Sequence, residues 1–450
     1  MSRLMVGVSG VRGIVGEALT AEVAEQFGRA FATMLPVGAT IALGRDTRPS
    51  GAMIRDAVVA GLSAGGINVI DLGVVSTPGV ALMIKHLSAE GGIVITASHN
   101  PAPYNGIKFM TPSGQNLPDD QARRLKDIQR SGKFSSAQTP GTTTQNDRTH
   151  DIHVRSVCDI VDVETVSSRK FKVVLDSING AGCVGTGLLL KKLGCELVHF
   201  NGEPTGQFAH EPEPVAANLD GLCEAVRRHH ADIGFAQDPD ADRLVVVDEN
   251  GRFIGEEYTL ALSSAFVLRR RKGPLATNLS TSRMMDDLAA SAGVQLYRTP
   301  VGEANVADVM VREGCIFGGE GNGGVMDPRV VLVRDSFVGI ALVLNYLAET
   351  GKKVTELIAE LPRYHMLKDK FPCPQADAVK ILSAVREALA SRPGATVNDE
   401  DGLRVDLPDG WVHVRASNTE PIMRIIAEAG DAEAAGKIVE NVRKIAEKAL

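Results

Sequence analysis

The sequence Asp-Pro-Asp-Ala-Asp-Arg at residues 238–243 lies between two apolar stretches, residues 233–236 before it and residues 244–247 after it. Short apolar runs bounded by turn residues are typical of buried strands. We therefore predict a strand, a tight loop and a second strand. The three aspartates alternate with other residues, and in an extended or looped backbone that spacing directs their carboxylates to one side, where they can converge.

Converging carboxylates repel one another unless a cation lies between them. Carboxylate oxygens suit a hard cation, so the loop predicts one Mg²⁺ per chain, held by Asp238, Asp240 and Asp242. Arg243 follows directly and supplies a positive charge. The alternative is a solvated acidic turn, because Asp and Pro both favour turns. An EF-hand is disfavoured, because the loop lacks the required glycine and glutamate.

Strands and helices alternate on both sides of this loop. In the N-terminal third we predict helices at about 20–34 and at 50–63, the second opened by a Ser50 cap, and strands at 40–43, 67–72 and 92–96. The alternation restarts near residue 172 and again near residue 275. This pattern predicts an α/β fold with three similar units and mixed, largely parallel sheets.

Two other segments differ from this pattern. Residues 117–148 are rich in Pro, Ser, Thr, Gln and Asn, and we expect them to form an exposed connection. The segment from about Leu367 onward is α+β in character. Its predicted elements are helices at 376–390 and 431–450 and strands at 403–407 and 411–415.

Composition excludes several classes of function. The chain has 450 residues, with 48 Lys and Arg against 55 Asp and Glu, and this balance provides no basic face for nucleic acid. We found no apolar run of about 18 residues and no signal-peptide core near Met1, so we expect a cytoplasmic protein without a membrane partner. The six cysteines lack Cys-x-x-Cys spacing and are expected to be free thiols.

A polar segment, residues 96–101, follows the predicted strand that begins at Gly92. Ser98 lies in this segment beside His99, and its hydroxyl is a candidate nucleophile or phosphate carrier. An ordinary polar turn is the alternative. The segment lacks the Gly-x-Ser-x-Gly pattern of a hydrolase, so a serine esterase or protease is disfavoured.

Two further clusters carry polar groups in turn-like sequences. Residues 318–324 contain five glycines, with Glu320 and Asn322 as the side chains, which suits recognition of sugar hydroxyls. A flexible linker is the alternative, but apolar residues flank the loop. Residues 415–421 follow a predicted strand and contain candidate phosphate ligands. These are Arg415, Ser417, Asn418 and Thr419. An ordinary polar turn ended by Pro421 is the alternative.

Taken together and in this order, the clusters resemble those of the α-D-phosphohexomutase family. The corresponding family segments are the phosphoserine loop (96–101), the metal loop (238–243), the sugar-recognition loop (319–324) and the phosphate-binding loop (415–421). Residues 9–13 resemble its opening motif, with a substrate-facing Arg12, and residues 104–108 resemble the segment that carries a lysine, Lys108, near the reacting phosphate. The resemblance spans essentially the whole chain.

The resemblance implies an isomerase that interconverts a hexose 6-phosphate and a hexose 1-phosphate. Ser98 would donate its phosphate to the sugar, and the resulting hexose 1,6-bisphosphate would turn over in the cleft and return the other phosphate to Ser98. The implied catalytic residues are Ser98, Arg12, Lys108 and His99. Mg²⁺ would be bound by Ser98 and the three aspartates. The substrate would be bound by Arg243, Glu320, Asn322 and the phosphate ligands. Four domains are implied around a central cleft, at 1–150, 151–255, 256–366 and 367–450.

The chain departs from many family members at the sugar-recognition loop, where Asn322 and Gly324 replace a serine and a histidine. The histidine that serves some members as general base has no counterpart in residues 298–305, where Glu303 is the candidate replacement. This version of the loop looks closer to family members that are phosphoglucosamine mutases or have mixed specificity. We therefore expect glucosamine phosphates as substrates, with mixed phosphomannomutase and phosphoglucomutase specificity as the alternative.

Two other classes of protein remain as alternatives. A metal-dependent sugar-phosphate phosphatase would also use a serine or a metal, but it does not explain a sugar loop together with a second phosphate pocket. A binding protein without activity is disfavoured by the intact Ser98 and aspartates. The expected partners are small sugar phosphates, and the expected state is a monomer or homodimer.

Overall fold

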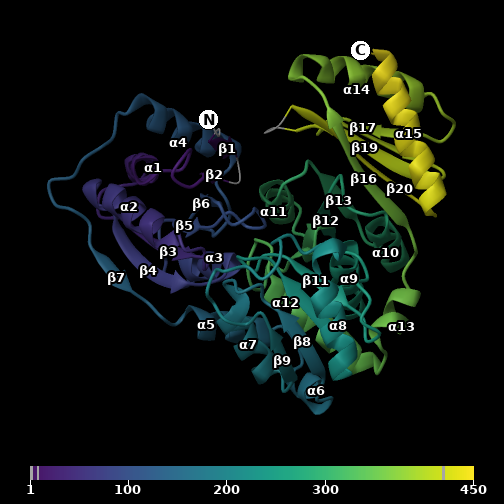
Figure 1. Cartoon of the computed structure of the whole chain (residues 1–450), viewed down its shortest axis with the longest axis horizontal. Coiled ribbons are helices and arrows are strands. Elements are labelled where there is room, and N and C mark those ends of the chain that lie inside the picture. The colour runs from purple at the N-terminus through teal and green to yellow at the C-terminus, as the bar shows by residue number, and fades with distance from the viewer. Residues whose placement is uncertain (1–3, 8–9, 418–420, 450) are drawn as a thin grey trace.

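The structure is a computed structural model, and it describes residues 4–7, 10–417 and 421–449. The strands form four sheets. Figure 1 shows the first sheet at one side, the second and third at the lower centre and right, and the C-terminal sheet at the upper right. The predicted fold class is confirmed, because three α/β units with mixed sheets precede an α+β unit.

The first sheet has the strand order β1-β2-β6-β5-β3-β4-β7. In this order, the first four strands pair antiparallel, and the pairs from β5 onward (β5-β3, β3-β4 and β4-β7) are parallel. The strands are β1 (Met5–Gly7), β2 (Gly10–Ile14), β3 (Thr40–Arg45), β4 (Asn68–Val74), β5 (Gly92–Ile95), β6 (Tyr104–Met110) and β7 (Thr143–Gln145). The helices are α1 (Ala21–Met34), α2 (Gly51–Ala64), α3 (Thr77–His86) and α4 (Asp119–Ser131). Arg12 and Lys108 therefore lie on adjacent strands, and Ser98 follows β5.

Helices α1 and α2 approach each other closely because each presents a glycine to the other. A Cβ atom at Gly28 would lie 2.5 Å from the carbonyl oxygen of Val58, and a Cβ atom at Gly61 would lie 2.3 Å from that of Glu25. Both distances are too short for a side chain. The two glycines therefore allow the helix backbones to pack in direct contact.

Two expectations for this unit are wrong. Ser50 makes no capping hydrogen bond at α2; its Oγ instead accepts one from Asn105 Nδ2 at 2.9 Å. Residues 117–148 are more than a connection, because they contain α4, which packs against α1, and the edge strand β7. Within α4 only Leu125 is buried, and most other residues of the helix are polar. The composition of the helix therefore resembles that of a loop.

The second sheet has the order β11-β10-β8-β9 and the third has the order β13-β12-β14-β15. In each, one edge pair is antiparallel and the other pairs are parallel. The strands are β8 (Lys172–Asp176), β9 (Glu196–Phe200), β10 (Ile233–Gln237), β11 (Leu244–Val247), β12 (Leu275–Asn278), β13 (Leu296–Thr299), β14 (Phe317–Glu320) and β15 (Gly324–Met326). The carboxylate loop and the glycine loop therefore occupy equivalent positions, each joining an antiparallel edge pair.

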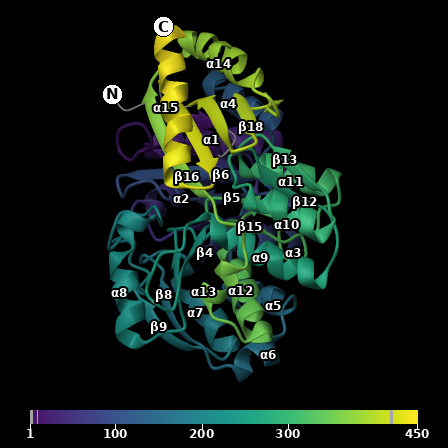
Figure 2. The ribbon, with the colours of Figure 1, turned by 90° about the vertical axis from the view of Figure 1, so that its right-hand side faces the viewer.

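These two units share one core with α12 at its centre. The helices of this part are α5 (Thr149–Cys158), α6 (Val163–Ser168), α7 (Gly182–Lys192), α8 (Asp220–His229), α9 (Glu257–Arg270), α10 (Met284–Ala292), α11 (Glu303–Arg312), α12 (Ser336–Thr350) and α13 (Val354–Ala359), with a 3₁₀ turn at Ala216–Asn218. Helix α12 is buried from Ser336 to Ala348 and packs against α5, α6 and α9 (Figures 1 and 2). This common core fixes the second and third sheets relative to each other.

The C-terminal sheet is antiparallel throughout, in the order β16-β20-β19-β18-β17. Its elements are β16 (His365–Pro372), α14 (Gln375–Ala390), β17 (Thr396–Asn398), β18 (Leu403–Leu407), β19 (Gly410–Ala416), β20 (Ile422–Ala429) and α15 (Ala432–Ala449). The predicted strands at 403–407 and 411–415 are confirmed as β18 and β19. A separate apolar core, which includes Ile381 and Val442, lies between this sheet and its two helices.

Two general features complete the description. Within the described ranges, no helix has the length and apolarity needed to cross a membrane. The six cysteines are free thiols.

Candidate active site

The loop between β10 and β11 gathers the three aspartates. One oxygen from each of Asp238, Asp240 and Asp242 lies within 4.8 Å of the others, and all three residues are buried. Asp238 Oδ1 accepts hydrogen bonds from the backbone N–H groups of Asp242 and Arg243, both at 3.1 Å, which close the loop. Ala241 has a φ of +55°, a left-handed conformation that turns the chain sharply before Asp242.

The donor set of this loop fits a metal ion. Asp240 Oδ1 and Asp242 Oδ1 are buried, and neither has a hydrogen-bond partner among the residues that the structure describes. A buried carboxylate oxygen without a partner is costly, and a hard cation prefers such oxygens as ligands. The three carboxylates could therefore hold an ion such as Mg²⁺.

The ionisation of the cluster supports the same interpretation. Burial, together with the charges of Asp242 and Asp240, raises the pKa of Asp238 well above its usual value. Burial acts in the same direction on Asp240, but the Lys108 ammonium and several hydrogen bonds lower the pKa of Asp240 overall. A cation bound between the carboxylates would favour ionisation of Asp238.

Ser98 lies directly against the carboxylate cluster. Its Oγ donates a hydrogen bond to Asp238 Oδ2 at 2.7 Å, and the residue is 1% exposed. Its φ of +49° lies in the left-handed region, which is uncommon for a residue other than glycine. Its backbone N–H donates to Thr96 Oγ1 at 2.9 Å. The hydroxyl is thus held in a fixed position beside the candidate metal ligands.

The buried guanidinium of Arg48 holds the loop that carries Ser98. It donates hydrogen bonds to the carbonyl oxygens of Ser98, Asn100, Pro101 and Tyr104, at distances of 2.7, 2.6, 3.0 and 2.9 Å. A single cation that binds several carbonyl oxygens restrains the loop much more strongly than one neutral hydrogen bond. The shape of the loop therefore depends on Arg48.

Lys108 and Arg12 place positive charge on the same side of the site. Lys108 Nζ lies 2.6 Å from Asp240 Oδ2 and 3.4 Å from Asp242 Oδ2. Burial lowers the pKa of Lys108, but these carboxylates outweigh that effect and raise it overall. Arg12 donates a hydrogen bond to Asn100 Oδ1 at 3.1 Å. The structure therefore brings both predicted cations to the Ser98 loop and the carboxylates.

His99 lies next to the serine hydroxyl, with its Nδ1 3.3 Å from Ser98 Oγ. The positive charge of Arg243, followed by burial, lowers the pKa of His99 well below its usual value. These two effects disfavour the imidazolium form, so His99 is held in its neutral form. A catalytic role for His99 stays a prediction.

Arg334, directly before α12, joins the carboxylate loop to the glycine loop. Its Nη2 donates to Asp242 Oδ2 at 2.8 Å, its Nη1 to Glu320 Oε2 at 2.9 Å and its Nε to Glu303 Oε2 at 3.0 Å. Glu303, the predicted replacement for a histidine, is thus held by an ion pair. One guanidinium neutralises three carboxylates that come from separate segments.

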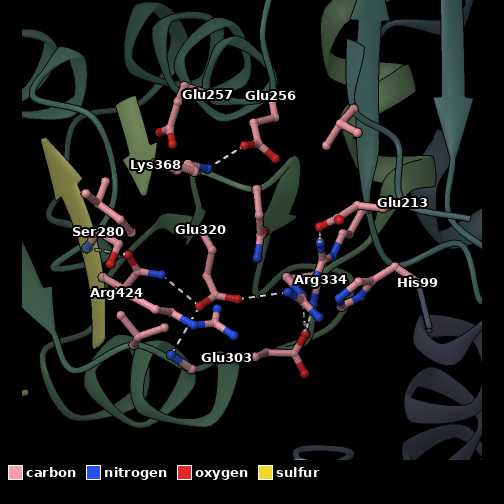
Figure 3. A pocket seen from close by; sticks show the side chains of 18 of the residues that line it. His99, Glu213, Glu256, Glu257, Ser280, Glu303, Glu320, Arg334, Lys368 and Arg424 are labelled. Carbon is pink, nitrogen blue, oxygen red and sulfur yellow. Dashed lines mark hydrogen bonds and ion pairs between the residues drawn. The ribbon is translucent and has the colours of Figure 1, made fainter. Parts of the chain in front are cut away.

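The glycine loop places Glu320 and Asn322 on the wall of a cavity of about 580 Å³. Glu320 Oε1 accepts hydrogen bonds from Asn278 Nδ2 at 2.8 Å and from the backbone N–H of Gly302 at 3.1 Å. Asn322 Oδ1 is buried and has no partner among the described residues. Figure 3 shows the Glu320 and Arg334 pair within the cavity, with His99 beyond Arg334.

All four units contribute to this cavity. It is lined by Arg12, His99 and Lys108 from the first unit, Arg243 from the second, Glu320 and Asn322 from the third, and Arg415 from the C-terminal unit. Its volume lies within the range of about 300–1,000 Å³ that is typical of small-molecule sites. The predicted site residues named here therefore face one common space.

Of the predicted phosphate ligands, Arg415 lines the cavity from the C-terminal unit. Arg415 Nε lies 3.3 Å from Asp401 Oδ2, and the same carboxylate oxygen accepts a hydrogen bond from the backbone N–H of Val301 at 3.0 Å. Asp401 thereby links the C-terminal unit to the third unit. Ser417 follows β19 and is half-buried, whereas Asn418 and Thr419 lie outside the described residues.

Family models of the phosphoglucomutase/phosphomannomutase domains match the chain in sequence order. The α/β/α domains I, II and III match residues 3–136, 151–251 and 255–364, and the C-terminal domain matches residues 370–445. The chain belongs to the α-D-phosphohexomutase family.

Known relatives are similar along the whole length of this phosphohexomutase. A phosphoglucomutase/phosphomannomutase of Thermococcus kodakarensis is 41% identical, and the alignment covers 99% of each chain. A probable phosphoglucosamine mutase of Methanopyrus kandleri is 37% identical over 98% of each chain. A phosphoglucomutase/phosphomannomutase family protein of Burkholderia thailandensis has a crystal structure with a TM-score of 0.88, at 30% identity over 99% of this chain and 98% of that chain. The enzyme is therefore an isomerase that acts on sugar phosphates.

Several residues at the site of this phosphohexomutase were not predicted from the sequence. Thr77 is the first residue of α3 and Arg334 lies two residues before α12, and at both positions the sequence reads as an ordinary helix start. Thr77 Oγ1 donates to Asp240 Oδ2 at 2.6 Å. Arg48 did have a signal, because it follows β3, which pairs in parallel with β5, and the carboxyl ends of parallel strands meet at one edge.

Proposed function

We propose that the enzyme interconverts glucosamine 6-phosphate and glucosamine 1-phosphate through a phosphorylated Ser98 and a 1,6-bisphosphorylated sugar. One Mg²⁺ per chain is held by Asp238, Asp240 and Asp242 together with the phosphate on Ser98. The observation that carries the proposal is the 2.7 Å contact between Ser98 Oγ and Asp238, beside His99, which lines a cavity formed by four units.

The chemistry is an in-line exchange of one phosphorus–oxygen bond for another. The bond between phosphorus and Ser98 Oγ breaks as a bond from phosphorus to a sugar hydroxyl oxygen forms; the hydroxyl proton passes to a base, and the leaving Ser98 Oγ takes up a proton. His99 is our first candidate for this proton transfer because its Nδ1 lies 3.3 Å from Ser98 Oγ, and Glu303, which lines the same cavity, is the second. A bound Mg²⁺ supplies charge neutralisation at the phosphoryl group. Lys108 and Arg12 add positive charge at the same place.

The opposite end of the cavity holds the phosphate that is not transferred. We assign that phosphate to Arg415, Ser417, Asn418 and Thr419, of which Arg415 lines the cavity; Arg243 lines it from the second unit. We assign Glu320 and Asn322 to sugar hydroxyls, because both line the cavity and Asn322 Oδ1 has no partner among the described residues. After the bisphosphate has reversed its orientation in the cavity, its other phosphate lies beside Ser98. The same exchange then runs in reverse and returns that phosphate to Ser98.

Relatives with different names support two candidate sugars. The probable phosphoglucosamine mutase of Methanopyrus kandleri, at 37% identity, supports glucosamine phosphates as substrates. The phosphoglucomutase/phosphomannomutase of Thermococcus kodakarensis, at 41% identity, supports mixed glucose and mannose specificity as the second candidate.

A coupled assay distinguishes these candidates. Migration of phosphate should be measured in parallel on the 6-phosphates of glucosamine, glucose and mannose, and kcat/KM is expected to be highest for glucosamine. A higher value for glucose or mannose would replace the proposed substrate with the second candidate. Net release of inorganic phosphate without a 1-phosphate product would indicate a phosphatase instead.

The phosphoserine step has its own measurement. Intact-mass analysis of freshly purified protein should show a fraction heavier by one phosphate, and peptide mapping should locate the phosphate on Ser98. Ser98→Ala should remove this fraction and abolish turnover. Full activity in Ser98→Ala would overturn the mechanism.

A further inference from the structure

Glu257, the first residue of α9, lies against the glycine loop that carries Glu320 and Asn322. A Cβ atom at Gly321 would lie 1.9 Å from Glu257 Oε2 and 2.3 Å from its Oε1, so the carboxylate lies directly against the backbone of this loop. Glu257 Oε2 also accepts a hydrogen bond from the backbone N–H of Ser282 at 3.0 Å. This hydrogen bond orients the carboxylate beside the loop.

The carboxylate of Glu257 lines the same cavity as the sugar-recognition residues. Figure 3 shows Glu257 and Glu320 in this cavity, with Lys368 beneath Glu257. Lys368 forms its ion pair with the neighbouring Glu256. Among the described residues, no cation lies within ion-pair distance of Glu257, although several other acidic groups of the cavity are paired with Arg or Lys.

Burial raises the pKa of Glu257 to about 8, with a smaller opposing contribution from Lys368. A cation that entered the cavity beside Glu257 would lower this value again, because it favours the ionised carboxylate. The site thus has an acceptor at a fixed position and lacks a positive partner among the described residues.

We propose that Glu257 is a specificity-determining residue that accepts a hydrogen bond from the ammonium group of an amino-sugar phosphate. The inference rests on the proposed function, since it names the residue that would select glucosamine over glucose and mannose. Its position beside Gly321, between the two residues assigned to sugar hydroxyls, places the carboxylate next to the sugar ring.

The chemistry of the two substituents makes the inference testable. An ammonium group donates hydrogen bonds and cannot accept them, whereas a hydroxyl group does both. In Glu257→Gln the amide oxygen can still accept the Ser282 N–H, which leaves the amide NH₂ facing the cavity. A hydroxyl can accept a hydrogen bond from this NH₂, but an ammonium group cannot. In the variant, kcat/KM for glucosamine 6-phosphate should therefore fall more than kcat/KM for glucose 6-phosphate.

The experiment compares kcat/KM for glucosamine 6-phosphate and glucose 6-phosphate in wild type and Glu257→Gln. The ratio of the two values is expected to fall by about tenfold to a hundredfold, the range for a hydrogen bond to a charged group. Glu257→Asp keeps a carboxylate and should retain the preference for glucosamine at a lower absolute rate. If Glu257 had only a structural role, Glu257→Gln would lower kcat/KM for both substrates by the same factor and leave their ratio unchanged.

Glu256→Gln is the matched control, because it makes the same carboxyl-to-amide change at the next position, where the carboxylate is paired with Lys368. It should change kcat/KM for both sugars by the same factor. Binding of the two 6-phosphates by calorimetry, in a Ser98→Ala background, provides a readout without turnover and should show the same loss of selectivity in Glu257→Gln.

The outcomes separate the two levels of the hypothesis. If the wild-type enzyme prefers glucosamine phosphate and Glu257→Gln keeps that preference, the role of Glu257 is refuted and the proposed function stands. If the wild-type enzyme does not turn over glucosamine phosphate, the proposed substrate is refuted and the role of Glu257 is refuted with it.

Discussion

Two regions of the candidate active site differ in burial and in what completes their polar groups. The transfer region (Ser98, Asp238, Asp240, Asp242 and Lys108) is buried, and its members are bonded to one another. Two of its carboxylate oxygens, Asp240 Oδ1 and Asp242 Oδ1, have no partner among the described residues and are available to a metal ion. The recognition region (Glu257, Glu320, Asn322 and Arg415) comes from three separate segments, is more exposed except at Glu320, and includes a buried amide oxygen without a partner among the described residues.

This difference indicates which region determines the rate of the reaction and which determines the affinity for the substrate. The transfer region has its geometry before substrate arrives, as electrostatic catalysis requires, because reorganisation during the reaction would raise the barrier. The recognition region is completed by the ligand. Substitutions in the first region should therefore reduce chemistry, and substitutions in the second should change affinity and sugar preference.

The largest effect should follow from Asp240→Asn in the transfer region. The variant loses one candidate metal ligand, so Mg²⁺ affinity by calorimetry should fall and turnover should drop by several orders of magnitude. A metal ion commonly stabilises the transition state by several kcal/mol, and each 1.4 kcal/mol is about tenfold in rate. Removal of the metal by chelation should have the same effect on the wild-type enzyme.

Asp71→Asn is the matched control for this substitution. Asp71 is on β4, pairs with Arg55 and is not among the residues that line the cavity. It should leave Mg²⁺ affinity and turnover unchanged. Wild-type activity that persists after exhaustive chelation would contradict the metal assignment.

A smaller effect, on KM, is expected for Arg415→Ala in the recognition region. If Arg415 binds the phosphate that is not transferred, KM should rise for the 1-phosphate and the 6-phosphate alike, because the sugar binds in both orientations. A hydrogen bond from a charged group is worth roughly 1.5–3 kcal/mol, or about tenfold to a hundredfold in KM. Steady-state kinetics in both directions provides the measurement.

Arg386→Ala serves as the control, because Arg386 belongs to the same unit, is exposed on α14 and pairs with Asp399. Both directions should keep their KM values in this variant. An effect of Arg415→Ala on one direction alone would be inconsistent with reorientation of the bisphosphate.

The smallest effect, a change of preference, is expected for Glu320→Gln. In the variant the amide oxygen can still accept from Asn278 and Gly302, whereas the amide NH₂ cannot accept from Arg334. The ranking of glucosamine, glucose and mannose phosphates by kcat/KM should shift by up to about tenfold, the range of an ordinary hydrogen bond at roughly 0.5–1.5 kcal/mol. An unchanged ranking and an unchanged KM would show that this loop does not recognise the sugar.

The sequence predicted the transfer region better than the recognition region, and the reason is physical. The metal loop is local, because its three carboxylates lie within five consecutive residues between two apolar strands. Glu257 and Arg334 contact segments that are distant in the sequence, and neither has a distinctive local sequence. Such residues become visible only when the fold brings the segments together.

The fold shows the same division. Apolar strands such as β8 and β12 were predicted from their composition, because they are buried at every position or nearly so. Helix α4 was missed, since a helix that buries a single leucine carries mostly polar residues. Ser50 was assigned as a cap from its position before α2, but its hydroxyl is bonded to Asn105, a contact that depends on tertiary structure.

Arg334 connects the two regions, because the same guanidinium binds Asp242 and Glu320. A substitution at position 320 therefore removes an acceptor from a cation that also neutralises a candidate metal ligand. Sugar preference at that position cannot evolve independently of the phosphoryl-transfer chemistry. Among descendants of a common ancestor, changes at positions 320 and 334 should accompany each other, and a lineage that changed one position alone would acquire its new preference together with a slower reaction.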